Sequence, residues 1–180
     1  MNTLIIEGTA REGRKSIHAA RFLEEKLQNS GHKTFLYDVK QKNIPPLGNR
    51  PYKDDEEPVP EDIKELSREV VEADLVVIVT PEYNHSIPGV LKNAMDYLYP
   101  EYDGKPFGYI TVSGGGFGGV RAQSHLHDIT LAVGGRPGPS MPVSRVGSVF
   151  DDEGDLQDES YDERFENFVE KLEDFVDSVS

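Results

Sequence analysis

The sequence has no cysteine, no long hydrophobic run and no excess of positive charge among its 180 residues. The lack of cysteine excludes disulfides, thiolate metal sites and cysteine nucleophiles. No segment approaches the roughly 20 apolar residues that a membrane-spanning helix needs, and the start "MNTLIIEG" lacks a basic leader, so we expect a cytoplasmic protein with no membrane association. A net charge of -14 provides no basic footprint for nucleic acid.

The acidity is concentrated at the C-terminal end. Residues 151–180 contain 13 Asp and Glu against Arg164 and Lys171, so residues 1–150 are only slightly negative. We interpret this as a solvated helix face rather than a partner-binding surface. The stretch "DDEGD" at 151–155 is too short and wrongly spaced for a calcium-binding loop, so we expect a surface turn.

Short apolar runs alternate with longer amphipathic stretches, which predicts one α/β domain over 1–180, with a parallel sheet covered by helices on both faces. The expected strands are 3–7, 33–38, 75–80, 107–113 and 138–143, and the expected helices are 16–29, 61–72, 88–99, 119–133 and 160–179. Glycines at 31 and at 134–135 are expected to cap helix ends. The proline-rich stretch 39–60 is expected to be a long exposed excursion, either functional or a flexible connector.

Three loops should meet at one edge of this sheet, because ligands of open parallel sheets bind beyond the carboxyl ends of the strands. The first, "GTAREGRKS" at 8–16, combines hydroxyl and basic side chains at a helix start and is typical of a monophosphate site, although it lacks both the GxxxxGK[ST] and GxGxxG patterns. An ordinary polar turn is the alternative.

The second loop, "PEYNHS" at 81–86, offers an amide, a phenol and backbone groups that suit the edge and face of a planar heteroaromatic ring. Ser86 is expected to cap the following helix, with Pro88 in its first turn. The third loop, "SGGGFGG" at 113–119, would let a flat ligand approach the backbone closely, although flexibility alone would also explain its glycines.

These stretches, together with "PEYNHSIPGVLKNAMDYL", "SGGGFGGVRAQSHL" and "VFDDEGDL", resemble the NAD(P)H-dependent FMN reductases, a family with the flavodoxin-like fold that includes quinone and azo-dye reductases. The resemblance covers nearly the whole chain. It implies a three-layer sandwich with a five-stranded parallel sheet of order 2-1-3-4-5. In many relatives a serine stands at the position of Thr9 and the interval to the second hydroxyl is shorter.

The resemblance also implies the site. Thr9, Arg11 and Ser16 would hold the FMN phosphate, with Arg14 as a further donor. The remaining flavin-binding residues would be Pro81, Glu82, Tyr83 and Asn84 beside the ring, and Ser113, Gly114, Gly115 and Gly116 along it.

In this family FMN carries the redox chemistry: NADPH or NADH gives hydride to it, and a small-molecule acceptor then enters the same cleft. No side chain is assigned as a general base. The resemblance further implies a homodimer or homotetramer, with Val90, Ala94 and Leu98 in either the interface or the core.

Two rival functions remain at this stage. A flavodoxin-like electron carrier would exchange electrons with a protein partner, and a phosphate-sensing module would use the first loop without flavin. A receiver domain is disfavoured because the first strand ends in "EGTA" rather than in paired acids. His125 and His127 are two apart on an expected helix and point to different faces, so we expect no metal site.

Overall fold

The computed structural model describes residues 1–48 and 59–179. Its centre is a five-stranded parallel sheet of order β2-β1-β3-β4-β5. The strands are β1 (Asn2–Glu7), β2 (Lys33–Asp38), β3 (Leu75–Pro81), β4 (Pro106–Val112) and β5 (Arg136–Val143). The expected strand order is therefore confirmed. The buried central strand "LVVIV" lies in the middle of the sheet, where helices cover both of its faces.

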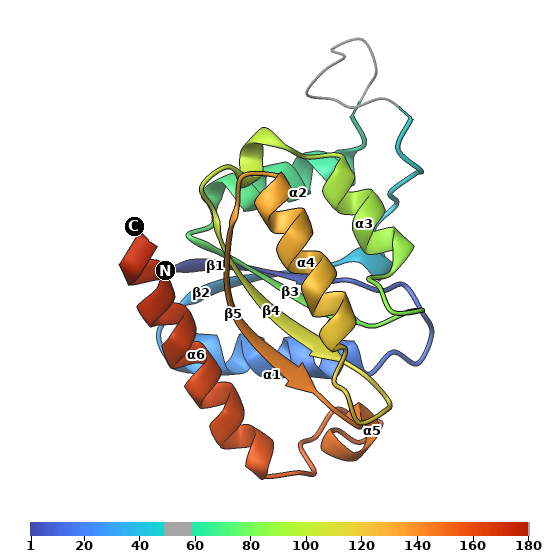
Figure 1. Ribbon diagram of the computed structural model, residues 1–180, viewed down its shortest axis with the longest axis vertical. Coiled ribbons are helices and arrows are strands. Elements are labelled where there is room, and N and C mark those ends of the chain that lie inside the picture. The colour runs from blue at the N-terminus through green and yellow to red at the C-terminus, as the bar shows by residue number, and fades with distance from the viewer. Residues whose placement is uncertain (49–58, 180) are drawn as a thin grey trace.

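Helices cover both faces of the sheet (Figure 1). The helices α1 (Ser16–Asn29) and α6 (Ser160–Val179) lie on one face. The other face carries α2 (Glu61–Glu72), α3 (Gly89–Asp96) and α4 (Val120–Ala132). The described part of the chain also contains three short helical segments: η1 (Val39–Gln41), η2 (Pro100–Tyr102) and α5 (Val146–Val149).

Each face of the sheet has its own apolar core. Alternation along β1 sends Leu4 and Ile6 to the α2 side and Ile5 to the α1 side. The expected stripe of α6 lies against the second core, where Phe165 and Leu172 are fully buried. At about 25 cal/mol per Å² of apolar surface removed from water, such fully buried side chains each contribute on the order of 2 kcal/mol.

Glycines in β4 and β5 allow α6 to lie close to the sheet. A Cβ at Gly108 would stand 2.4 Å from Leu172 Cδ2, and one at Gly138 would stand 2.4 Å from Phe175 Cε1. Elsewhere the expected helix caps are confirmed, since Gly31 and Gly134 have φ values of 83° and 79°.

Several local expectations were wrong. The segment after β2 is not wholly exposed, because Val39 is buried and Ile44 and Leu47 pack against the first core; residues 49–58 of that stretch lie outside the described residues. The third helix ends at Asp96, short of the expected residue 99, and the sequence did not indicate α5. Ser86 does not cap α3, because its hydroxyl is hydrogen-bonded to His125 Nδ1 at 2.8 Å.

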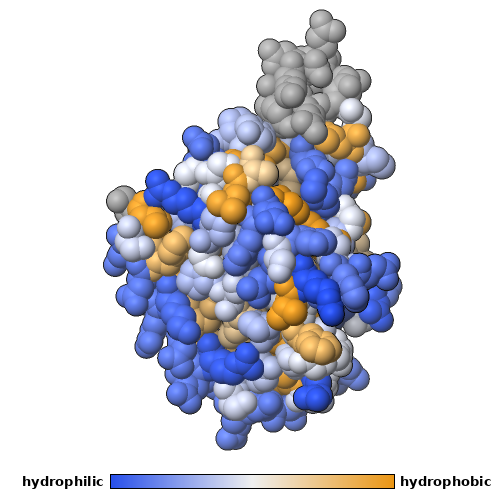
Figure 2. Space-filling view, viewed as in Figure 1, coloured by the Kyte–Doolittle hydropathy of each residue, from blue (hydrophilic) through white to orange (hydrophobic). Residues whose placement is uncertain are grey.

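The acidic C-terminal segment forms the outer surface of α6. On the face drawn in Figure 2, the margin along α6 is predominantly hydrophilic. The inner side is tied to α1 by Lys26, which lies 2.7 Å from Asp162 and 2.9 Å from Glu166. The expected surface turn at 151–155 is present, with Asp151 Oδ1 accepting hydrogen bonds from two backbone N–H groups. Within residues 1–48 and 59–179, no helix combines the length and apolar character that crossing a membrane requires.

Candidate functional site

A cavity of about 360 Å³ lies at the carboxyl edge of the sheet. The three expected loops meet there, and a fourth segment at the start of α5 completes the wall with Val146 and Gly147. The volume falls within the range of small-molecule sites. The rule that ligands bind beyond the carboxyl ends of parallel strands places this fourth segment at the edge as well, because it follows β5.

The loop after β3 is a tight hairpin turn. Tyr83 and Ser86 exchange backbone hydrogen bonds of 2.9 and 3.0 Å around Asn84 and His85, whose φ values are 49° and 64°. Two successive left-handed residues define a type I′ turn, for which asparagine is well suited. The turn directs Tyr83 into the cavity wall and leaves Asn84 exposed.

Glu82 joins this turn to α4. Its Oε2 accepts hydrogen bonds from the backbone N–H groups of Arg121 at 3.1 Å and Ala122 at 3.4 Å. These donors belong to the first turn of α4 and have no partner within the helix, and a negative charge there also interacts favourably with the helix dipole. Glu82 therefore lines the cavity and caps a neighbouring helix.

The glycine-rich loop after β4 is held at several points. Ser113 Oγ donates to the carbonyl of Gly115 at 2.9 Å and accepts from the N–H of Gly118 at 3.0 Å. From the segment after β5, Arg145 N–H donates to the same Gly115 carbonyl and Val146 N–H donates to that of Ser113. A Cβ at Gly114 or Gly115 would meet nothing within 4 Å, so this backbone is open to a ligand.

The first loop folds around a buried carboxylate that the sequence analysis did not single out. Glu7, the last residue of β1, is fully buried. Its Oε1 accepts a hydrogen bond of 2.5 Å from Ser16 Oγ, and its Oε2 accepts one of 3.3 Å from Thr9 N–H. Arg14 Nε lies 3.0 Å from Oε2, close enough for an ion pair although its N–H makes no hydrogen bond.

Arg14 lies between two acids. Its Nη2 contacts Asp38 at the end of β2, which is paired with Glu7 in the sheet register. Burial raises the pKa of Glu7 from 4.5 to about 7, while the Ser16 hydroxyl, the Arg14 charge and the Thr9 N–H act in the opposite direction. Glu7 therefore exchanges a proton near neutral pH.

Arg11 differs from the other basic residues of this loop. Arg14 pairs with Glu7 and Asp38, and Lys15 pairs with Asp152 at 2.5 Å. Within residues 1–48 and 59–179, Arg11 has no ion-pair partner, and it is exposed at the cavity wall. A free guanidinium at the N-terminal side of α1 suits an anion.

Thr9 lies behind this loop and connects it to the turn after β3. It is buried, and its hydroxyl is hydrogen-bonded to Tyr83 Oη at 2.7 Å. The same hydroxyl oxygen accepts the N–H of Arg11 at 3.3 Å. Thr9 thereby holds together the two loops that line the cavity.

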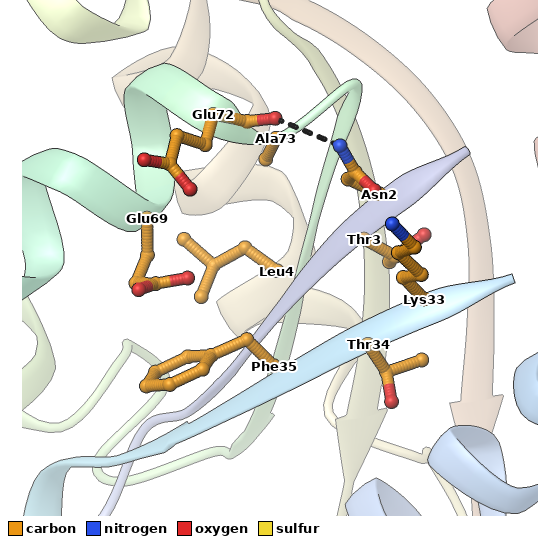
Figure 3. Close-up of a pocket in the computed structure, with 9 residues that line it drawn as sticks. All are labelled: Asn2, Thr3, Leu4, Lys33, Thr34, Phe35, Glu69, Glu72 and Ala73. Carbon is orange, nitrogen blue, oxygen red and sulfur yellow. Dashed lines mark hydrogen bonds between the residues drawn. The ribbon is translucent and has the colours of Figure 1, made fainter.

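A second hollow, of about 280 Å³, lies at the opposite end of the sheet, between the amino ends of β1 and β2 and the end of α2 (Figure 3). In that view Glu72 lies above the apolar side chain of Leu4, and the Glu69 carboxylate lies beside Leu4 and above the ring of Phe35. Lys33 lines this hollow as well, and none of the sequence-predicted site residues does.

The expected site residues thus fall into two groups. Those that line the carboxyl-edge cavity are Arg11, Arg14, Ser16, Pro81, Glu82, Tyr83, Ser113 and Gly114. Those that adjoin it without lining it are Thr9, Asn84, Gly115 and Gly116. Their roles toward a ligand stay predictions. The two histidines considered for metal binding have separate partners, since His125 contacts Ser86 and His127 lies 3.3 Å from Ser140 Oγ.

Comparison with known proteins identifies the class. Residues 1–145 match the NADPH-dependent FMN reductase family, and the chain belongs to that family. It is similar to the NADH:(hydroxy)cinnamate reductase subunit CrdA of Vibrio ruber, with 32% identity over 88% of this chain and 79% of the relative. It is similar to the NAD(P)H-dependent FMN reductase LOT6 of Saccharomyces cerevisiae, with 33% identity over 81% of this chain and 84% of the relative.

Solved structures show the same fold. The flavoenzyme FerB, an NAD(P)H:(acceptor) oxidoreductase from Paracoccus denitrificans, superposes with a TM-score of 0.80 at 24% identity, over 99% of this chain and 98% of that one. An FMN-dependent NADH-azoreductase from Bacillus anthracis, solved with FMN, gives a TM-score of 0.64 at 18% identity, over 94% and 98% of the two chains. The fold is flavodoxin-like, as expected.

Membership of this family makes the chain an oxidoreductase with FMN as cofactor and NADPH or NADH as electron donor. The cavity fits that cofactor in two respects. Arg11, from the loop before α1, lines one wall and has no ion-pair partner among residues 1–48 and 59–179, and the open backbone of Gly114 lies along another wall. A phosphate at the first and a flat ring beside the second would agree with both features.

Proposed function

We propose that the protein passes reducing equivalents from NAD(P)H through FMN, bound in the carboxyl-edge cavity, to a small-molecule acceptor. Quinones are the acceptor class to test first, with azo compounds, metal oxyanions and free flavin as alternatives. Relatives named quinone reductase, from Pseudomonas putida, and NADPH azoreductase, from a Bacillus species, support the quinone and azo classes. The observation that carries the proposal is that the guanidinium of Arg11, unpaired among the described residues, and open glycine backbone line a single cavity.

The chain's own residues bind and orient. Arg11 would pair with the phosphate, together with N–H groups at the start of α1 and the hydroxyl of Ser16. Tyr83 and Pro81 would contact the ring from one loop and Gly114 from another, while Thr9 holds the first two loops in register through its bond to Tyr83. When bound, FMN supplies the hydride and electron transfer chemistry. No side chain of the cavity is assigned as a general base.

The test is an absorption spectrum of the purified protein followed by steady-state oxidation of NADPH and NADH with a quinone. We expect a yellow protein, or one that takes up FMN stoichiometrically, and quinone-dependent oxidation over many turnovers. A protein that stays colourless and shows no heat of binding with FMN would contradict the proposal.

The rival electron carrier would use the same cofactor and a protein partner. Its distinguishing property is the absence of sustained NAD(P)H oxidation with a small acceptor, so the same assay separates the two. The open cavity, lined by loops from four strands, favours the small-molecule acceptor, because a carrier needs only an exposed ring edge.

We further propose that residues 1–180 act as one FMN-binding domain in the cytoplasm and assemble as a homodimer or homotetramer. Ala94 of α3 and Leu98, just beyond the end of that helix, are buried in the core of the protomer, whereas Val90 of α3 is 43% exposed and is available for a contact between copies. Light scattering during size-exclusion chromatography measures the assembly, and a monomeric mass would contradict it.

A further inference from the structure

We propose that Glu7 is a positioning residue that couples binding of the FMN phosphate to uptake of one proton. The inference rests on the proposed function, because it concerns the same cavity. Glu7 lies directly behind the loop that would hold the phosphate. It accepts hydrogen bonds from Thr9 N–H and Ser16 Oγ, and it forms an ion pair with Arg14.

The coupling follows from the hydroxyl of Ser16. A serine has one hydrogen to donate, and here it is donated to Glu7 Oε1 at 2.5 Å. While Glu7 is ionised, Ser16 can offer a phosphate only lone pairs, which repel it. When Glu7 carries a proton, its own O–H can donate to Ser16 Oγ, and the Ser16 hydrogen becomes free to donate to a phosphate oxygen.

Charge acts in the same direction. From β2, Asp38 shares Arg14 with Glu7, so one guanidinium serves two carboxylates before any ligand arrives. The neighbour of Glu7 in β3 is Val79, which brings no charge, and α1 contributes the neutral Ser16. Arg14 and Asp38 are thus the charged groups that act on Glu7. A phosphate placed beside this cluster favours the neutral form of Glu7.

The proton is taken from solvent and ends on Glu7, so each phosphate bound takes up at most one proton, and about half of one at pH 7, where about half of the flavin-free protein already carries it. Since Glu7 exchanges its proton near pH 7, the effect falls in the range where the protein can be studied. A raised pKa in the complex leaves FMN binding strongest below pH 7 and weakens it above.

The experiment measures FMN affinity of the flavin-free full-length chain at pH 6 and pH 8, for the wild type and Glu7→Gln. The phosphate of FMN itself ionises near pH 6. This ionisation affects the Kd of the wild type and of the variant alike, so it cancels in the ratio of the two Kd values. We expect the ratio of wild-type to variant Kd to rise about tenfold between pH 6 and pH 8, the limit for one proton exchanged around pH 7. Riboflavin, which lacks the phosphate, should give a ratio that does not change.

Ser16→Ala tests the hydroxyl separately. It should weaken FMN binding several-fold at pH 6, where the hydroxyl is free to donate, and leave it nearly unchanged at pH 8, where the hydroxyl is held by Glu7. An equal loss at both pH values would overturn the mechanism.

A third measurement needs no variant. Calorimetric titration of the wild type with FMN at pH 7, in two buffers of different ionisation enthalpy, should show net proton uptake that is absent with riboflavin. A pH-independent Kd ratio, or no uptake, overturns the role of Glu7 while leaving the flavin proposal intact. If the wild type binds neither FMN nor riboflavin, the proposed function fails and this inference with it.

Discussion

At the scale of single residues, the two basic side chains Arg11 and Arg14 stand three positions apart and have different surroundings. Arg14 is held between Glu7 and Asp38, whereas Arg11 is exposed and has no ion-pair partner in the described part of the chain. Only a side chain that is free before binding gives its full interaction to a ligand, because no existing pair must be broken.

Arg11→Ala should therefore weaken FMN binding at least tenfold, since one charge-assisted hydrogen bond contributes about 1.5–3 kcal/mol. Riboflavin affinity should be unchanged. Arg21→Ala, which removes an exposed arginine of α1 outside the cavity, serves as the matched control. Fluorescence titration with FMN and with riboflavin measures these affinities for the wild type and both variants. Unchanged FMN affinity in the Arg11 variant would contradict the assignment.

Gly114→Ala separates ligand approach from packing. Its new Cβ would meet no protein atom within 4 Å, so the free energy of unfolding should stay within about 0.5 kcal/mol of the wild type. The methyl group would lie at the cavity wall and should weaken FMN binding. Gly89→Ala, which is equally unobstructed but outside this cavity, should leave FMN binding unchanged. Urea unfolding and flavin titration distinguish the two effects.

Glu7 also makes stability depend on pH. Its folded-state pKa is raised from 4.5 to about 7, so its contribution is complete below pH 4.5 and is lost as the pH rises through 7. The full loss is on the order of 3 kcal/mol for this shift. Glu7→Gln should therefore gain stability relative to the flavin-free wild type between pH 5 and pH 8 in urea unfolding. Parallel pH profiles of the two proteins would show that Glu7 does not titrate in this range.

At the scale of elements, Glu82 connects the turn after β3 to the start of α4. Glu82→Ala should lower the free energy of unfolding by about 1 kcal/mol, the usual effect of losing a helix cap. Glu82→Gln keeps an acceptor oxygen and should lose less. Urea unfolding measures both variants, and equal stability of Glu82→Ala and the wild type would mean that water replaces the carboxylate at no cost.

The sequence predicted elements better than side-chain directions. Apolar periodicity gave the bounds of β2, α1, α2 and α6 without error, because each begins and ends where its pattern does. It gave no sign that Ile44 and Leu47 would pack against the core, since few apolar residues stand among the prolines there.

At the candidate site, too, the sequence predicted which loops meet but not the directions of their side chains. Chain topology was enough to bring the three loops together at one edge. The inward direction of Arg14 and Ser16 depends on a single buried acid at the end of β1, which reads in the sequence as an ordinary polar strand end. The turn at 83–86 was readable as a turn, but its type follows from two left-handed residues, Asn84 and His85, and neither is the glycine that marks such turns most strongly in a sequence.

At the scale of the whole molecule, charge is unevenly distributed and opposes compactness. The net charge is -14, and α6 with the turn before it carries most of the excess. Pairs such as Lys26 with Asp162 and Lys15 with Asp152 offset part of the repulsion, but the acid of each pair is exposed, Asp162 to 47% and Asp152 to 91%. Exposed pairs contribute little, so repulsion among the acids dominates.

Raising NaCl from 20 to about 300 mM should therefore raise the urea midpoint of unfolding, because the Debye length falls to near 6 Å and screens the like charges. An uncharged osmolyte at matched osmolality controls for effects on water. A midpoint that falls with salt would mean that the ion pairs contribute more than the repulsion costs.

The contact between α6 and the glycines of β4 and β5 has a practical meaning for anyone who would shorten this chain. The family match ends at residue 145, yet Phe165 and Leu172 fill a core whose other half lies before that point. A fragment cut at 145 would leave Ile110 and Val77 without their cover and should aggregate on expression. What looks like an acidic appendage is thus indispensable to a soluble product.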